Sequence, residues 1–239
     1  IAASEHPGEP AADDPAALVA PTGAGRIDGR SAGARFAARH GYSLAQAERY
    51  SMLELPVGPR LLDRLHTQAA AVAGDAYRLI GWTDRTPDEW VDGIAALLTR
   101  MSTDAPLGEL DIREEPWDAA RLRVYEAQRA AGGFAVHMVA AQHVETGELA
   151  GFTAVECPLD KPEVVEQGDT IVLRAHRGHR LGLLLKAEML RRLTVERPEA
   201  RRVHTWNAEE NDHMLGINVA LGFRPRGVVG VWQKTVSPG

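Results

Sequence analysis

The stretch that decides the fold runs Ile171-Val172-Leu173-Arg174-Ala175-His176-Arg177-Gly178-His179-Arg180-Leu181-Gly182. Its β-branched beginning predicts a strand, which then turns through glycine into a helix. The first backbone N–H groups of a helix have no partner inside the helix, and the helix dipole adds partial positive charge there. The junction therefore predicts an anion site, although a tight turn with no ligand fits these residues equally well. It is not a P-loop, because no Gly-Lys-Ser/Thr follows.

Positive charge is concentrated in and after this junction. Residues 174–202 carry nine cations, Lys186 among them, and three acids, whereas the whole chain has a net charge of −6. Such a local cluster suits a phosphorylated small molecule better than a nucleic acid, because a duplex would also approach the acidic remainder. No ladder of aromatic residues interleaves the cations, so we predict no nucleic-acid partner. On composition alone, a helix with a solvated basic face explains the cluster.

The composition is that of an ordinary soluble globular protein. The chain has 239 residues, 44% of them hydrophobic and 25% charged, which excludes a wholly disordered or fibrous chain. At about 150 residues per domain, this length predicts one complete domain and a remainder. No apolar run approaches the roughly 20 residues of a membrane span, and the first residues do not form a signal peptide. Cys157 is the only cysteine and cannot form an internal disulfide, so we predict a cytoplasmic protein with no membrane partner.

Periodicity from residue 77 onward predicts alternating strands and helices. The order is strand, two helices, three strands, helix, strand, helix and strand, which indicates an α/β mixed sheet with helices over it. Thr86 and Pro87 have the residue types of a helix cap and a first helical position, so a helix is expected to begin there. The expected strands are 77–82, 134–144, 149–155, 170–173, 202–206 and 228–232, and the later helices are 115–131, 179–194 and 211–221.

The first 75 residues have a different character. Residues 1–30 are rich in Ala, Pro, Gly and Asp with almost no periodicity, and they predict a loop or a partly ordered arm. A short helix over 34–40, a strand over 50–55 and a helix over 61–72 follow. This pattern is typical of the end of one domain and a connection into the next.

Two motifs in the second part of the chain resemble a known family. Residues 172–182 resemble the acyl-CoA-binding motif of the GNAT acetyltransferase superfamily, usually Arg/Gln-x-x-Gly-x-Gly/Ala, but Arg180 stands where the first motif glycine is expected. Residues 211–223 resemble the Asn-x-x-Ala through Leu-Gly-Phe helix of the same superfamily, with Met214 in place of the alanine. The hairpin around 146–152 resembles its second and third strands. Together, the resemblance covers about residues 76–234.

The resemblance implies a fold and a domain organisation. The implied fold is the α/β GNAT acyl-CoA N-acyltransferase fold, in which helices flank a central mixed sheet. Residues 35–42 and the strand after them resemble the end of another GNAT domain, so the chain is similar to a tandem GNAT protein with a truncated first domain. We therefore predict residues 1–56 as the C-terminal remnant of that first domain with a loop-rich arm, 57–75 as a connecting helix, and 76–239 as a complete GNAT domain with an acetyl-CoA site. The strand 50–55 is then expected to pair with the sheet of the second domain.

The resemblance also implies acetyl-CoA as co-substrate and assigns residues to it. In the family, the strand that matches Val172 splays from its neighbour, its backbone groups bind the pantetheine arm, and the following loop binds the pyrophosphate. The implied pantetheine contacts are Val172, Leu173 and Arg174. The implied pyrophosphate contacts are Arg177, Gly178, His179, Arg180, Leu181 and Gly182, and Asn211 is a further candidate for binding the cofactor.

The implied reaction is direct attack of an amine on the thioester, with a primary amine of a small molecule as acceptor. An ammonium group has no lone pair, so a base must remove a proton. The candidates are Asp169, which we prefer, Glu166 and Glu156. Strand alternation places Glu166 and Asp169 on opposite faces unless a bulge intervenes. Both carboxylates also fit structural roles, Glu166 as loop surface and Asp169 as a hydrogen-bond acceptor for a turn.

The acid that protonates the leaving thiolate is not evident. The tyrosine that often serves as this acid in the family falls at Asn218, and an amide cannot donate a transferable proton. Asn218 is therefore equally well explained as a buried structural amide. Trp206 and Asn207 end the strand beside the implied thioester site, where they line the acceptor pocket or serve only as packing and a turn.

Two other classes of function compete with an enzyme. A CoA-binding or regulatory module without catalysis is the main alternative, because the tyrosine is missing and Arg180 replaces a glycine. A nucleic-acid binder is the weaker one. The histidines lack metal-ligand spacing with Cys157, so we predict no metal, and the sequence leaves a homodimer open.

Overall fold

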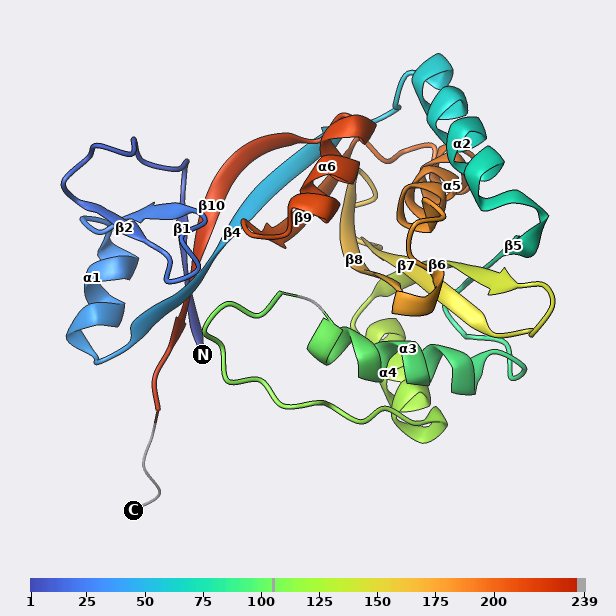
Figure 1. Ribbon diagram of the computed structural model, residues 1–239, viewed down its shortest axis with the longest axis horizontal. Coiled ribbons are helices and arrows are strands. Elements are labelled where there is room, and N and C mark those ends of the chain that lie inside the picture. The colour runs from blue at the N-terminus through green and yellow to red at the C-terminus, as the bar shows by residue number, and fades with distance from the viewer. Residues whose placement is uncertain (105, 236–239) are drawn as a thin grey trace.

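The computed structural model of the chain describes residues 1–104 and 106–235. Within these residues, the main sheet has eight strands in the order β1-β10-β4-β9-β8-β7-β6-β5 (Figure 1). All neighbours are antiparallel except β8 and β9. The strands are β1 (Ala2–His6), β4 (Ser43–Glu54), β5 (Tyr77–Thr83), β6 (Phe134–His143), β7 (Leu149–Pro158), β8 (Val164–Val172), β9 (Arg202–Ala208) and β10 (Arg224–Gln233).

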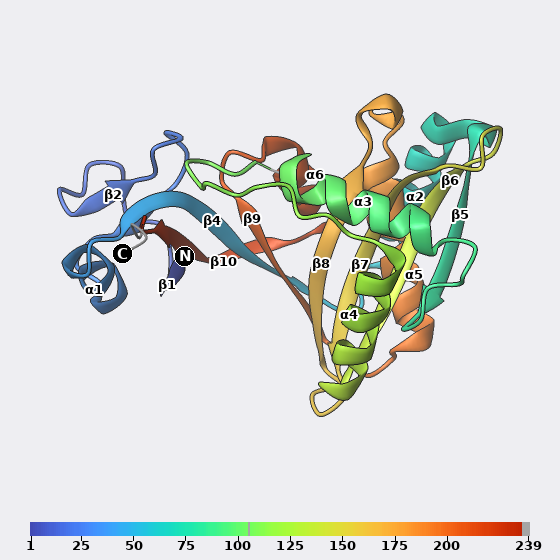
Figure 2. The same ribbon diagram turned by 90° about the horizontal axis from the view of Figure 1, so that it is seen from below.

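Helices cover both faces of this sheet. On one face lie α2 (Pro59–Ala73), α5 (Leu181–Glu196) and α6 (Asp212–Leu221). On the other, α3 (Val91–Asp104) and α4 (Ala119–Ala131) lie over β6, β7 and β8 (Figure 2). The predicted α/β mixed sheet flanked by helices is therefore confirmed. Two short 3-10 turns, η1 (Gly74–Ala76) and η2 (Arg174–His176), precede β5 and α5.

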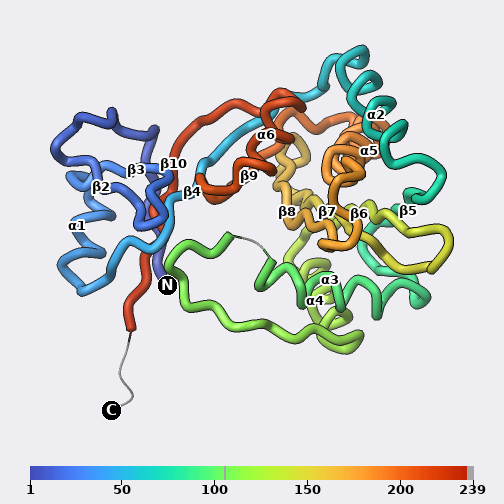
Figure 3. The backbone as a smooth tube through the Cα atoms, in the orientation of Figure 1, coloured from blue at the N-terminus to red at the C-terminus, as the bar shows by residue number. Residues whose placement is uncertain are grey.

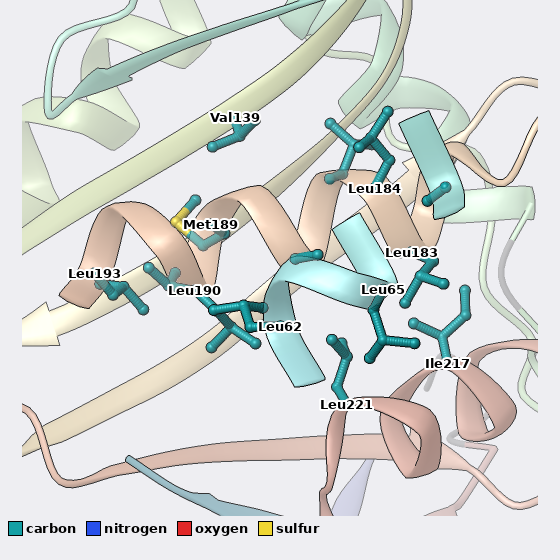
Figure 4. Close-up of a cluster of buried hydrophobic side chains, with 14 of the residues drawn as sticks. Leu62, Leu65, Val139, Leu183, Leu184, Met189, Leu190, Leu193, Ile217 and Leu221 are labelled. Carbon is teal, nitrogen blue, oxygen red and sulfur yellow. The ribbon is translucent and has the colours of Figure 1, made fainter. Parts of the chain in front are cut away.

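The largest core lies between α5 and the sheet. Ten of the sixteen residues of α5 are buried, so the helix is apolar on nearly all sides. Leucines of α2 cover its outer side, Ile217 and Leu221 of α6 pack beside it, and Val139 of β6 lies beneath it (Figure 4). This packing fixes the N-terminus of α5 against the end of β8.

The strand β4 belongs to the first part of the chain but lies inside the main sheet. It pairs with β10 on one side and β9 on the other, and Figure 3 traces it as a long curved strand beside both. The expected pairing of residues 50–55 with this sheet is confirmed, although the strand is longer than predicted. The division of the chain into a remnant and a complete domain stays a prediction.

The prediction of a loop or arm over residues 1–30 is wrong in part. The strand β1 pairs with β10, and β2 (Ala17–Val19) pairs with β3 (Arg26–Asp28) in a small separate hairpin. Ile27 of this hairpin is fully buried in a third core with Trp232, beside α1 (Ala32–Arg39). Short strands of Ala, Ser and Glu have little strand propensity of their own, and here the distant β10 supplies the pairing.

Two predicted helix starts are also wrong. The helix expected from Pro87 begins at Val91, and residues 88–90 form a turn instead. Thr86 is buried, its backbone N–H donates to Glu126, and its hydroxyl does not cap the helix. The helix expected from residue 115 begins at Ala119, because the Asp118 side chain caps it.

Candidate functional site

The parallel strands β8 and β9 separate along their length. They pair only between residues 164–166 of β8 and 202–204 of β9. Beyond this point β8 continues on β7 as far as Val172, and β9 continues on β4 as far as Ala208. The two facing edges therefore carry backbone N–H and C=O groups that the sheet does not pair, and an extended ligand can bind them.

A β-bulge in β8 decides which carboxylates share a face. Gly168 and Asp169 together oppose the single residue Ala154 of β7. Val165 consequently packs in the core under α5, whereas Ile171 packs in the core under α3 and α4. The sequence left this bulge open, and its presence places Asp169 on the same face as Glu166.

A cavity of about 250 Å³ lies under α3 and α4 and ends at this bulge. Asp169 and Glu156 both line it, whereas Glu166 does not. Its walls are apolar, with charged groups at intervals. The apolar lining includes Leu98, Leu122, Val136, Met138 and Phe152, and the charged lining comprises Asp84, Glu126, Arg129, Glu156 and Asp169.

The two carboxylates at the cavity differ in their partners. Glu156 accepts hydrogen bonds from the Tyr125 hydroxyl at 2.7 Å and from the Arg129 guanidinium. The Asp169 carboxylate has no hydrogen-bond donor from the described part of the chain. Loss of solvent raises the pKa of Asp169, and the nearby charge of Glu156 raises it further. A carboxylate with a raised pKa and no fixed donor is suited to accept a proton.

The predicted anion site lies at the start of α5. Arg180 is the N-cap residue, with a left-handed φ of 55°, and its side chain does not cap the helix. Glycine, which the resembled motif has at this position, adopts a left-handed conformation without strain, whereas arginine adopts it at a cost. The amides of residues 181–183 have no acceptor within the helix, because the first N–H of α5 that bonds within the helix is that of Leu184.

The structure was compared with solved structures. A tandem GNAT protein from the clavulanic acid biosynthesis pathway is 31% identical, with a TM-score of 0.67 over 86% of this chain and 59% of its own length. The chain has the GNAT fold. A GCN5-related N-acetyltransferase from Sphaerobacter thermophilus shares this fold at 14% identity, with a TM-score of 0.56 over 86% of this chain and 56% of its own. The resemblance to the GNAT superfamily is thus confirmed. The chain spans less than two thirds of either structure, and no protein-family model or curated protein matches its sequence.

Within this GNAT fold, two arginines of the implied CoA site contact Asp104 at the end of α3. Arg177 is assigned to the pyrophosphate and Arg174 to the pantetheine arm. The Arg177 guanidinium donates to Asp104 at 3.1 Å and to the Val172 carbonyl at 3.2 Å. Arg174 lies 3.6 Å from the same carboxylate. The Leu173 N–H donates to the Ala150 carbonyl and therefore belongs to the sheet.

The remaining predicted CoA residues have visible structural roles. Gly182 lets α5 approach α6, since a Cβ there would lie 3.1 Å from Ile217. The Asn211 side chain caps α6 by accepting from the Met214 N–H at 3.2 Å. Leu181 is buried, His179 packs against the Tyr77 ring, and Gly178 has a φ of 90°.

The two residues expected at the acceptor pocket point in opposite directions. Trp206 stacks on Tyr50, with 42% of its surface exposed, and Asn207 is hydrogen-bonded to Asn218 on the other face of β9. Neither residue lines the cavity under α3 and α4. Successive side chains of a strand alternate between its faces, so the sequence already contained the signal that separates them.

Sequence reasoning missed Tyr125 and Arg129, because α4 reaches Glu156 only through tertiary packing. It also counted Lys186 in a solvated basic cluster, which is wrong. Lys186 is only 2% exposed and donates to Asn218. Its position within an apolar run of α5 was the signal that it is buried.

No helix over residues 1–104 and 106–235 is both long and apolar enough to cross a membrane. Over the same residues, His, Cys, Asp and Glu side chains do not gather in threes as a metal site requires. The predictions on metal, compartment and homodimer stay predictions.

Proposed function

We propose that the chain is an acyl-CoA-dependent N-acyltransferase that transfers an acetyl group from acetyl-CoA to a primary amine of a small molecule. Its likeness to a tandem GNAT protein supports acyl-CoA-dependent acetyl transfer in general. The observation that carries the proposal on the acceptor is the cavity under α3 and α4. It ends at Asp169, beside the gap between β8 and β9.

Acetyl-CoA would bind along that gap. Its pantetheine arm would pair with the free edge of β8, and its pyrophosphate would bind the amides that begin α5. Arg177 and Arg180 would add charge-assisted hydrogen bonds to the phosphates. Arg177 now binds Asp104, so the phosphate would replace this carboxylate as its partner.

The cavity favours a small amine with an apolar body. Its volume is below the 300–1,000 Å³ that is usual for sites of drug-sized ligands. Four carboxylates and one arginine line it, an excess of negative charge that suits an ammonium group. Three of them, Asp84, Glu126 and Glu156, accept hydrogen bonds from the protein, which leaves Asp169 for the acceptor.

The reaction then needs one proton transfer before bond formation. Asp169 accepts a proton from the ammonium group, which frees the nitrogen lone pair. The nitrogen attacks the carbonyl carbon of the thioester, and a C–N bond forms. The C–S bond breaks and its electron pair stays on sulfur. The nitrogen, which carries an extra proton after the attack, releases it to solvent, and the thiolate takes the proton held by Asp169.

Release of free CoA with a panel of small primary amines tests the proposal. Asp169→Asn should lower turnover by about 10²–10⁴-fold, and the loss should shrink at high pH, where more of the amine is already neutral. Glu166→Gln is the matched control, since Glu166 lies on the same strand and face but outside the cavity. We expect it to lose less than about tenfold.

Two outcomes would contradict the proposal. If the wild-type chain binds acetyl-CoA but turns over none of the amines, the non-catalytic CoA-binding module becomes the better account. If folded Asp169→Asn keeps its turnover while Glu156→Gln or Glu166→Gln loses more, the role of base belongs to that residue.

A further inference from the structure

Lys186 is a buried lysine that the proposed reaction does not yet use. Its only hydrogen-bond partner in the described part of the chain is the Asn218 carbonyl oxygen, 2.8 Å from Nζ. The ring of Phe223 lies 5.6 Å away, and within the same residues no carboxylate forms an ion pair with the ammonium. A charged group in a core without a counter-charge is costly, so its retention calls for a role.

The lysine fixes the direction of a chain of hydrogen bonds. While Lys186 is protonated it only donates, so the oxygen of the Asn218 amide then faces Lys186. The Asn218 nitrogen then donates to the Asn207 oxygen at 2.7 Å, and the Thr205 hydroxyl donates to the same oxygen at 3.3 Å. The oxygen of Asn207 is thus occupied. Its NH₂ group is the end of the chain and has no acceptor among residues 1–104 and 106–235.

This end of the chain lies on the separated half of β9. Asn207 follows His204, the last residue of β9 that pairs with β8. Asn218 stands where the resembled family often has the tyrosine that protonates the thiolate. The hydrogen-bond chain therefore runs from the core of the protein to the stretch of β9 that borders the gap in which the thioester would bind.

We propose that Lys186 is a positioning residue which, through Asn218, holds the Asn207 NH₂ group toward the leaving sulfur of the thioester. This inference rests on the proposed function. As the C–S bond breaks and its electron pair moves to sulfur, an Asn207 N–H hydrogen-bonds the developing thiolate and keeps its proton. The proton that completes the thiol is the one the amine lost to Asp169. When Lys186 is protonated, its charge polarises both amides, which strengthens the last donor of the chain.

Asn218→Asp tests the donor-to-acceptor direction of this hydrogen-bond chain, because it removes the Asn218 NH₂ donor with little change of side-chain volume. The new carboxylate accepts from Lys186 and gains an ion pair, so the fold should hold, but it has no donor for Asn207. Asn207 must then turn its NH₂ group inward and its oxygen toward the gap. We expect kcat to fall by about 10²-fold, the order seen when one donor to a developing charge is removed, with KM for acetyl-CoA changed less than threefold.

Gln142→Glu is the matched control. Gln142 is also a buried amide that accepts from a cation, the Arg78 guanidinium, and donates to a backbone carbonyl, but it lies on β6. It should keep kcat within twofold. Lys186→Met and Asn207→Ala should each lower kcat, and the double variant should lose no more than the worse single one, because both act through one chain. Multiplied losses, or an Asn218→Asp variant with wild-type kcat, would overturn the inference.

A second readout does not depend on turnover. The side-chain NH₂ resonances of Asn207 should shift when acetyl-CoA is added to the wild-type chain and should not shift in Asn218→Asp. If these shifts occur while no amine is acetylated, the proposed function fails and the orientation of Asn207 stands. If the wild-type resonances do not respond to bound acetyl-CoA, the orientation itself is wrong.

Discussion

Replacing Lys186 by methionine should stabilise the fold at neutral pH. This stabilisation should decrease as the pH rises. Burial lowers the pKa of the Lys186 ammonium from its ordinary 10.5 to about 7. Between these values the unfolded chain binds a proton that the folded chain does not, so stability rises with pH. From this shift, keeping the lysine buried costs about 4 kcal/mol at pH 7 and about 1 kcal/mol at about pH 9.5.

Methionine has a similar length and no such cost, but it leaves the Asn218 oxygen without its donor, which costs about 1–3 kcal/mol. The variant should therefore be more stable than the wild type by about 1–3 kcal/mol at pH 7. Between pH 7 and about pH 9.5 this difference should decrease by about 3 kcal/mol and change sign or vanish.

Urea unfolding of both proteins at the two pH values measures their free energies of unfolding. In the difference between variant and wild type, the contributions of all groups that titrate equally in the two proteins cancel. Leu185→Met is the control, since it changes the same helix without a titrating group, and its effect should be independent of pH. A Lys186→Met difference that is equal at both pH values would refute the reasoning, because it would mean that the lysine carries its charge equally in the folded and unfolded states.

Two further predictions concern other parts of the molecule. A chain that begins at residue 57 should not unfold cooperatively, because it lacks β4 and leaves β9 and β10 without their common neighbour; a sigmoidal thermal transition near that of the full chain, followed by circular dichroism, would contradict this. Asp104→Asn should tighten acetyl-CoA binding by up to about fivefold in calorimetry. In the wild type, Arg174 and Arg177 must give up their ion pairs with Asp104 to bind the phosphates, and exposed ion pairs of this kind are worth about 0.2–1 kcal/mol. Equal or weaker affinity would show that Asp104 does not compete with the phosphates.

The parts of the fold that the sequence predicted are those with strong local signals. The hairpin of β6 and β7 and the helices α2, α5 and α6 follow from hydrophobic periodicity, and glycines end α2 and α6. The strand β1 could not be predicted from hydrophobic periodicity, since its residues have low strand propensity and its pairing comes from β10, far along the chain. The start of α3 was wrong because Thr86 has the residue type of a cap but is buried under α4.

The candidate site divides in the same way. The strand-to-helix junction at residues 172–182 is local and was predicted. The preference for Asp169 over Glu156 and Glu166 as the base stays a prediction. The sequence could not decide whether a bulge lies at Gly168 and Asp169, because strand register depends on the partner strand. Lys186 was assigned to the surface by counting charges, and only the packing of α2 and α6 around α5 reveals that it is buried.

The position of β4 has a consequence for synthesis of the protein on the ribosome. The ion pair between Arg226 and Glu54 joins residues 172 positions apart, so β4 leaves the ribosome long before β10. At roughly 5–20 residues per second, this wait lasts roughly 10–30 s. For most of that time, until β9 has been made, this strand of 12 residues lacks both of its neighbours, β9 and β10. Its charged residues, Glu48, Arg49 and Glu54, make it a poor partner for the edges of other chains, so the strand is protected against aggregation until β9 and β10 have been synthesised.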